Sequence, residues 1–148
     1  MRSLLAEAVL RELGGGVFKA FSCGAPGQVA KEMSPIALQV LNKAGIATDG
    51  LHPKDWSFLA SSGAPRMDVV ITLDATLGLL RPPWPGQPEQ ALWSFPDLHL
   101  IDSPAQQRTE ATRLLYALQR RLDLLAALHH KVQGPRELRD DLRDLARH

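Results

Sequence analysis

The sequence predicts a three-layer α/β fold, with a Rossmann-like parallel sheet between helices. Short apolar runs rich in β-branched residues alternate along the chain with longer segments of helical periodicity. Ser-Pro pairs at Ser34 and Ser103 are typical helix starts, with a serine N-cap and proline in the first turn. The run 68–73, DVVITL, is almost wholly apolar, as in a strand that is covered on both faces.

The N-terminal half supplies four expected elements. A first helix carries Leu5, Val9 and Leu13 on one face and ends at the glycines of 14–16. The segment 17–24, VFKAFSCG, predicts a short buried strand. A second helix runs from Ser34 to Gly45, and a short helix behind a turn is expected within 50–60.

The C-terminal half adds the strand 68–73, a proline-rich loop at 80–88 and a short strand or extended segment at 91–97. A long helix then starts at Ser103, with a buried stripe of leucines: Leu114, Leu115, Leu118, Leu122, Leu125 and Leu128. Gly134–Pro135 breaks it, and a last charged helix follows over 138–145. The expected organisation is one domain over 1–128 and a C-terminal helical extension over 129–148.

Composition excludes several classes of function. The 148-residue chain has a net charge of +1 and no apolar stretch long enough to span a membrane, and we expect a cytoplasmic protein. Arginines in the last segment alternate with carboxylates, so nucleic acid is not an expected partner. The histidines of the C-terminal region have no ligand partners at metal spacing, and we expect neither a metal nor a cofactor.

The N-terminus raises a specific question. Arg2 stands at the start of the first helix, where anions bind, yet the sequence shows no strand before that helix. In a doubly wound sheet the first strand normally delivers the chain to this point.

The segments RSLLAEAVLREL, FSCG, SPIALQVLNKAGIATDGLHPKDW, DVVITL, PPWPGQP and ALWSFPD, in this order, resemble the low-molecular-weight tyrosine phosphatase family. The resemblance is strongest to the arsenate reductase branch and runs from Arg2 to about Leu128. It implies a phosphate loop Cys-x5-Arg-Ser, in which a cysteine attacks phosphorus or arsenic and the arginine holds the oxyanion. Arg2 and Ser3 match the end of this loop, and the cysteine position falls five residues before Met1.

The resemblance also implies a general acid, and Asp97 matches it. The family has proline after this aspartate, where this chain has Leu98. Arsenate reductases with internal redox chemistry carry two further cysteines, whose positions match Leu73 and Arg81. Reductase activity would therefore need an external thiol or a thioredoxin- or glutaredoxin-like partner.

Cys23, the one cysteine of the chain, is expected at the end of the segment 17–24. It is either a small buried thiol or a substitute nucleophile at the sheet edge that faces the site.

Three hypotheses follow from the sequence. The true protein starts upstream and is a phosphatase or arsenate reductase, with Arg2 as clamp and Asp97 as acid. Alternatively, the chain is a catalytically dead family member that binds an oxyanion or a partner protein. The third hypothesis is a poorly folding gene remnant.

Overall fold

The computed structural model describes residues 1–14, 19–24, 32–60, 64–65, 67–74 and 88–129. The elements in chain order are α1 (Arg2–Gly14), α2 (Pro35–Lys43), α3 (Ser57–Ala60), β1 (Val69–Thr72), β2 (Glu89–Leu92), the 3-10 helix η2 (Leu98–Leu100) and α4 (Pro104–His129). The two helices that were predicted to start at Ser34 and Ser103 are present as α2 and α4, and each serine lies directly before its helix.

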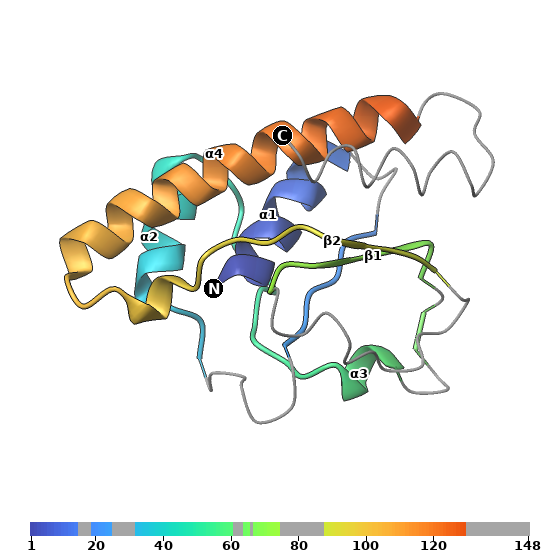
Figure 1. Ribbon diagram of the computed structural model, residues 1–148, viewed down its shortest axis with the longest axis horizontal. Helices are drawn as coiled ribbons and strands as arrows, with labels where there is room; N and C mark the ends of the chain where they lie inside the picture. Colours follow the sequence, from blue (N-terminus) through green and yellow to red (C-terminus); the bar gives the residue numbers. More distant parts are fainter. Residues whose placement is uncertain (15–18, 25–31, 61–63, 66, 75–87, 130–148) are drawn as a thin grey trace.

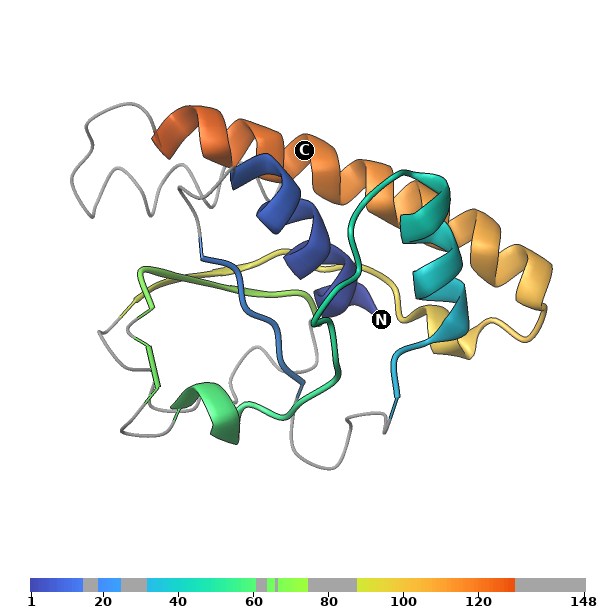
Figure 2. The ribbon, with the colours of Figure 1, turned by 180° about the vertical axis from the view of Figure 1, so that it is seen from behind.

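Strands β1 and β2 form a parallel pair, with Val69 opposite Glu89 and Thr72 opposite Leu92. Helices α1, α2 and α4 lie on one side of these strands and α3 lies on the other (Figures 1 and 2). Parallel strands joined by a long connection, with helices beside them, make this the expected α/β fold. Each residue of β1 is only half-buried, so the strand is less covered than its apolar sequence predicts.

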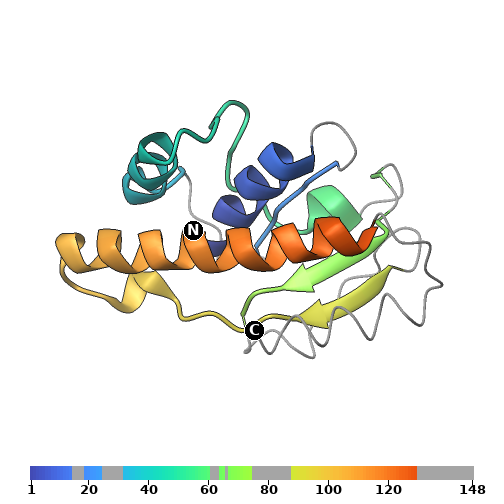
Figure 3. The ribbon, with the colours of Figure 1, turned by 90° about the horizontal axis from the view of Figure 1, so that it is seen from above.

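Helix α4 provides the surface on which the core is built. It runs along the molecule and packs against α1 and α2 (Figure 3). Its buried leucines are those of the predicted stripe, Leu114, Leu115, Leu118, Leu122 and Leu125; they pack with Leu5, Val9, Leu41 and Trp93. The helical periodicity of the sequence therefore identified the core face of α4.

The two ends of α2 follow from its local sequence. Ser34 is the N-cap and Pro35 begins the helix, although the serine hydroxyl makes no capping hydrogen bond. At the other end Gly45 has a φ of 74°, which glycine adopts without steric cost. The N–H of Gly45 donates to the Asn42 carbonyl, and the N–H of the next residue, Ile46, donates to Leu41. These two bonds make a Schellman motif that ends the helix.

The prediction of a buried strand over 17–24 is wrong for the residues that the structure describes, 19–24. The segment is extended, but Gly24 alone forms a bridge, in parallel with Asp55. Its amide donates to the Lys54 carbonyl, and its carbonyl accepts from Trp56. The side chain of Phe21 is 41 % exposed, so the apolar pattern here does not mark a strand inside the sheet.

Strand β2 begins at Glu89, two residues before the short strand or extended segment expected over 91–97. Residues 93–97 continue beyond the strand, and the amides of Trp93 and Phe95 still donate to the Thr72 and Leu73 carbonyls. The loop positions 80–87 and the expected last helix over 138–145 lie outside the described residues. Helix α4 itself reaches His129, one residue beyond the expected domain boundary. Within the described part of the chain, no helix is long and apolar enough to cross a membrane.

Replacing Leu118 by alanine tests the core. The Leu118 side chain is fully buried on α4, and we expect Leu118→Ala to lower the free energy of unfolding by about 2–5 kcal/mol. Leu124→Ala on the same helix is the matched control: this leucine is 38 % exposed, so a loss under about 1 kcal/mol is expected. Urea unfolding followed by tryptophan fluorescence measures both, and equal losses would contradict the assigned core.

Candidate functional site

Arg2 begins α1, and its guanidinium group is held at the carboxyl ends of both strands. Nη1 donates a hydrogen bond of 2.7 Å to the carbonyl oxygen of Phe95, three residues after β2. Nη2 donates to Oδ2 of Asp74, 2.9 Å away and two residues after β1. Only 16 % of the Arg2 side chain is exposed. Ligands of open α/β sheets bind at this edge, so Arg2 lies where a site is expected.

Asp74 is a site residue that the sequence reasoning missed. Its carboxylate and the Arg2 guanidinium form an ion pair in which both side chains are mostly buried. The available signal was its place directly after the apolar run 68–73, since the carboxyl ends of parallel strands meet at one edge. The ion pair fixes the direction in which the guanidinium fork points.

Asp97, the predicted acid, lies in the turn that follows β2. It caps η2, where its Oδ1 accepts a 3.0 Å hydrogen bond from the His99 amide. Burial lowers the pKa of the Met1 α-amino group; the positive charge of Arg2 lowers it further, and the negative charge of Asp97 raises it. Asp97 and Arg2 therefore both act on the start of α1, and the structure brings the two predicted site residues to one end of the sheet.

Cys23 lies apart from Arg2, in the extended segment beside Lys54 and Asp55. Burial raises the pKa of its thiol to about 11, against a smaller lowering by Lys54, while Asp55 adds to the rise. A nucleophilic cysteine needs the opposite shift, because the thiolate is the reactive form. The environment of Cys23 thus favours the small-thiol interpretation over the substitute nucleophile.

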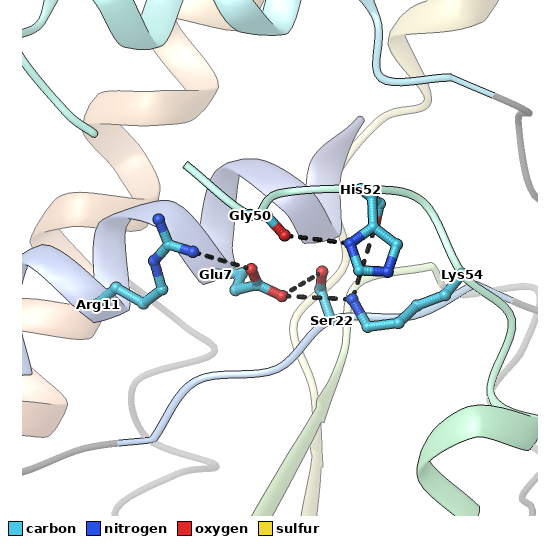
Figure 4. A network of polar contacts seen from close by, with 6 residues as sticks. All are labelled: Glu7, Arg11, Ser22, Gly50, His52 and Lys54. Carbon is cyan, nitrogen blue, oxygen red and sulfur yellow. Dashed lines mark hydrogen bonds and ion pairs between the residues drawn. The ribbon is translucent and has the colours of Figure 1, made fainter. Parts of the chain in front are cut away.

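A buried carboxylate, Glu7, ties α1 to two other segments (Figure 4). The hydroxyl of Ser22 donates a 2.9 Å hydrogen bond to its Oε1. Lys54 Nζ lies 3.7 Å from the same oxygen, and Arg11 Nη1 lies 3.7 Å from Oε2. His52 Nδ1 lies 3.1 Å from the Gly50 carbonyl oxygen, and Lys54 Nζ also donates to the His52 carbonyl at 3.4 Å. The network anchors the helix that carries Arg2.

Residues 1–80 match the model of a family described as low molecular weight phosphotyrosine protein phosphatase. The chain belongs to this family. Among solved structures, an arsenate reductase in reduced state is similar at 24 % identity and a TM-score of 0.57. The match covers 86 % of this chain and 89 % of that one, and at this identity it shows the fold. A search of curated proteins finds none that matches.

Of the other positions that the resemblance to the phosphatase family singled out, the structure describes Ser3, Leu73 and Leu98. Ser3 is half-buried in the first turn of α1. Leu73 is half-buried and packs against the core, while its carbonyl accepts from the Phe95 amide at 3.2 Å. Leu98 is buried at the start of η2, so an apolar side chain anchors the turn that carries Asp97. Arg81 lies outside the described residues. In the described part of the chain, no three His, Cys, Asp or Glu side chains could hold a metal ion.

Removing Glu7 tests the buried network. Glu7→Ala takes the carboxylate from the Ser22 hydroxyl and leaves the Lys54 ammonium only the His52 carbonyl, and we expect the free energy of unfolding to fall by about 3 kcal/mol. Glu110→Ala is the control, because it breaks an exposed pair with Arg113 and is expected to cost under about 1 kcal/mol. Thermal unfolding of both variants measures the difference. Equal effects would show that the Glu7 contacts add nothing to stability.

Alkylation of Cys23 tests its surroundings. The folded protein should react with iodoacetamide at a rate that rises up to about pH 11, because only the thiolate reacts. At pH 8 we expect a rate roughly 100-fold below that of the urea-unfolded chain, whose thiol pKa is about 8.5. Mass spectrometry measures the rate, and Cys23→Ser gives the background. A midpoint near pH 8.5 in the folded protein would contradict the assigned burial.

Proposed function

We propose that this chain binds a tetrahedral oxyanion of the arsenate or phosphate class at the start of α1, with Arg2 as the cationic clamp. The observation that carries the proposal is the Arg2 guanidinium, held by Asp74 and the Phe95 carbonyl at the carboxyl ends of two parallel strands. Membership of the phosphatase family supports it, because Arg2 and Ser3 match the end of the family's phosphate loop.

The chemistry of the clamp suits a doubly charged anion. An arginine carries five N–H donors, of which one bonds to Phe95 and one to Asp74. The three remaining donors would bind the oxyanion, and the first amides of α1 would add the positive end of the helix dipole. The carboxylates of Asp74 and Asp97 oppose an anion here. A ligand must therefore interact with several donors at once, as a tetrahedral oxyanion does.

Arsenate is the substrate that we favour, with phosphotyrosine as the alternative. The similar solved structure is that of an arsenate reductase, and it supports this choice. In the family mechanism Asp97 would protonate the leaving group. The attacking cysteine would stand five residues before Met1, so we propose thiol chemistry only for a chain that carries a cysteine there.

Leu73 supports a requirement for outside reductant. It stands where we place the first redox cysteine of arsenate reductases, and an apolar side chain cannot form the disulfide. We propose that reduction of arsenate would use an external thiol or a thioredoxin- or glutaredoxin-like protein. A cytoplasmic location fits this chemistry, since reduced thiols are maintained there.

The second candidate is a family member without catalysis that binds an oxyanion or a partner protein. The leucines at 73 and 98 favour it, because they replace the cysteine and the proline of the family pattern. Turnover separates the two candidates. Arsenate reduction with an added dithiol, or hydrolysis of an aryl phosphate, favours the enzyme; binding without turnover favours the module.

Substitution of Arg2 tests the clamp. By calorimetry, Arg2→Ala is expected to weaken arsenate and phosphate binding at least about tenfold, because hydrogen bonds to charged groups contribute about 1.5–3 kcal/mol each. Arg2→Lys should recover only part of the affinity, since an ammonium cannot present a planar fork. Arg113→Ala removes the same charge from an exposed position on α4 and should leave binding unchanged. Equal affinities for Arg2→Ala and the unmodified chain would reject the site.

A further inference from the structure

Arg121 on α4 contacts two aromatic rings, and two of its buried nitrogens have no hydrogen-bond partner among the described residues. Its guanidinium carbon lies 4.6 Å from the centre of the Phe95 ring and 5.8 Å from that of Trp93. Nε and Nη1 are buried and have no hydrogen-bond partner among the described residues. Burial also lowers the pKa of this side chain. The contacts are therefore those of a cation stacked on aromatic rings.

Such an arrangement is not the most stable one for the fold. A buried N–H without an acceptor is destabilising, and the stack on the aromatic rings offsets only part of that loss. An unbranched apolar side chain of similar length would fill the same space without that cost. The presence of arginine at this position therefore points to a role other than stability.

Phe95 connects Arg121 to the candidate site. Its ring lies under the Arg121 guanidinium, and its carbonyl oxygen accepts the 2.7 Å hydrogen bond from Arg2 Nη1. Its amide donates to the Leu73 carbonyl at 3.2 Å, next to Asp74. One residue thus has its ring held by one arginine while its carbonyl holds the other.

We propose that Arg121 is a positioning residue of the oxyanion site, which fixes Phe95 so that the Phe95 carbonyl orients the Arg2 guanidinium. The effect of Arg121 on ligand affinity rests on the proposed oxyanion binding. The effect of Arg121 on the orientation of the Arg2 guanidinium is independent of that proposal. The guanidinium matters because its central carbon lies 4.6 Å over the ring centre and a planar cation can stack there, which a lysine ammonium on its flexible stem does not reproduce.

Arg121→Met is the variant that tests this. It keeps a side chain of similar length, removes the charge and the stack, and is expected to weaken arsenate and phosphate binding about fivefold. Arg120→Met is the matched control, since Arg120 is the exposed neighbour on the same helix and loses the same charge. Phe95→Leu keeps the carbonyl and removes the ring, so it should have the same effect as Arg121→Met. The double variant Arg121→Met/Phe95→Leu should bind only slightly more weakly than either single variant, because the two substitutions remove the same contact.

A second readout does not depend on any ligand. The Nε–Hε signal of Arg2 in 15N-labelled protein, identified by its loss in Arg2→Lys, reports how firmly the guanidinium is held. We expect faster exchange of this proton with water in Arg121→Met and no change in Arg120→Met. The free energy of unfolding of Arg121→Met should equal or exceed that of the unmodified chain, because the substitution removes two buried guanidinium nitrogens, Nε and Nη1, that have no hydrogen-bond partner among the described residues.

The outcomes separate the two proposals. An unchanged Arg2 signal in Arg121→Met overturns the positioning role, whether or not the protein binds an oxyanion. A changed signal in a protein that binds neither arsenate nor phosphate rejects the proposed function and supports the positioning role. A loss of stability in Arg121→Met, with the Arg2 signal unchanged, would make Arg121 a purely structural residue.

Discussion

The orientation of Arg2 depends on the packing of α4 against α1, α2 and the segment that leaves β2. The leucine face of α4 fixes the position of α1, and so the point from which the Arg2 side chain starts. Trp93, fully buried at the end of β2, fixes the chain just before Phe95. The guanidinium is then held by two groups that follow two different strands, Asp74 after β1 and Phe95 after β2. Its geometry is a property of the whole core and not of a local loop.

The candidate site combines charged groups whose burial or proximity destabilises the fold. Arg2 is paired with a carboxylate, and Asp97 lies at the same end of the sheet. Arg121 adds a cation whose buried N–H groups lack acceptors among the described residues. Groups held in costly surroundings are common at sites of binding and catalysis, because selection for function keeps them there. The destabilising groups of this molecule therefore lie at the site that the Arg2 contacts and the family membership indicate.

The sequence predicted those features that depend on local or periodic signals. The Ser34–Pro35 start, the glycine at 45 and the leucine stripe of α4 each act through neighbours three or four residues away. The prediction for 17–24 was wrong because apolar residues form a strand only where a neighbouring strand is available to pair with them. In this segment Gly24 alone pairs, with residues 54–56. The position of Asp74 after the run 68–73 places it at the sheet edge, but its pairing with Arg2, 72 residues away, has no sequence pattern. The contact of Arg121 with Phe95, 26 residues away, has none either. Arg2 was noticed from its place at a helix start, and the family resemblance supplied its expected role and that of Asp97.

The network at Glu7 has a consequence for which substitutions natural variants can carry. The Glu7 carboxylate accepts a hydrogen bond from Ser22 and pairs with two cations, Arg11 and Lys54. Either cation can therefore be lost while the other still balances the negative charge. Loss of the carboxylate, by contrast, leaves two positive charges and a hydroxyl at once. Among relatives with this network, position 7 should therefore change only after 11 and 54 have changed. The order of substitutions, and not just their identity, is constrained by the number of partners each group has.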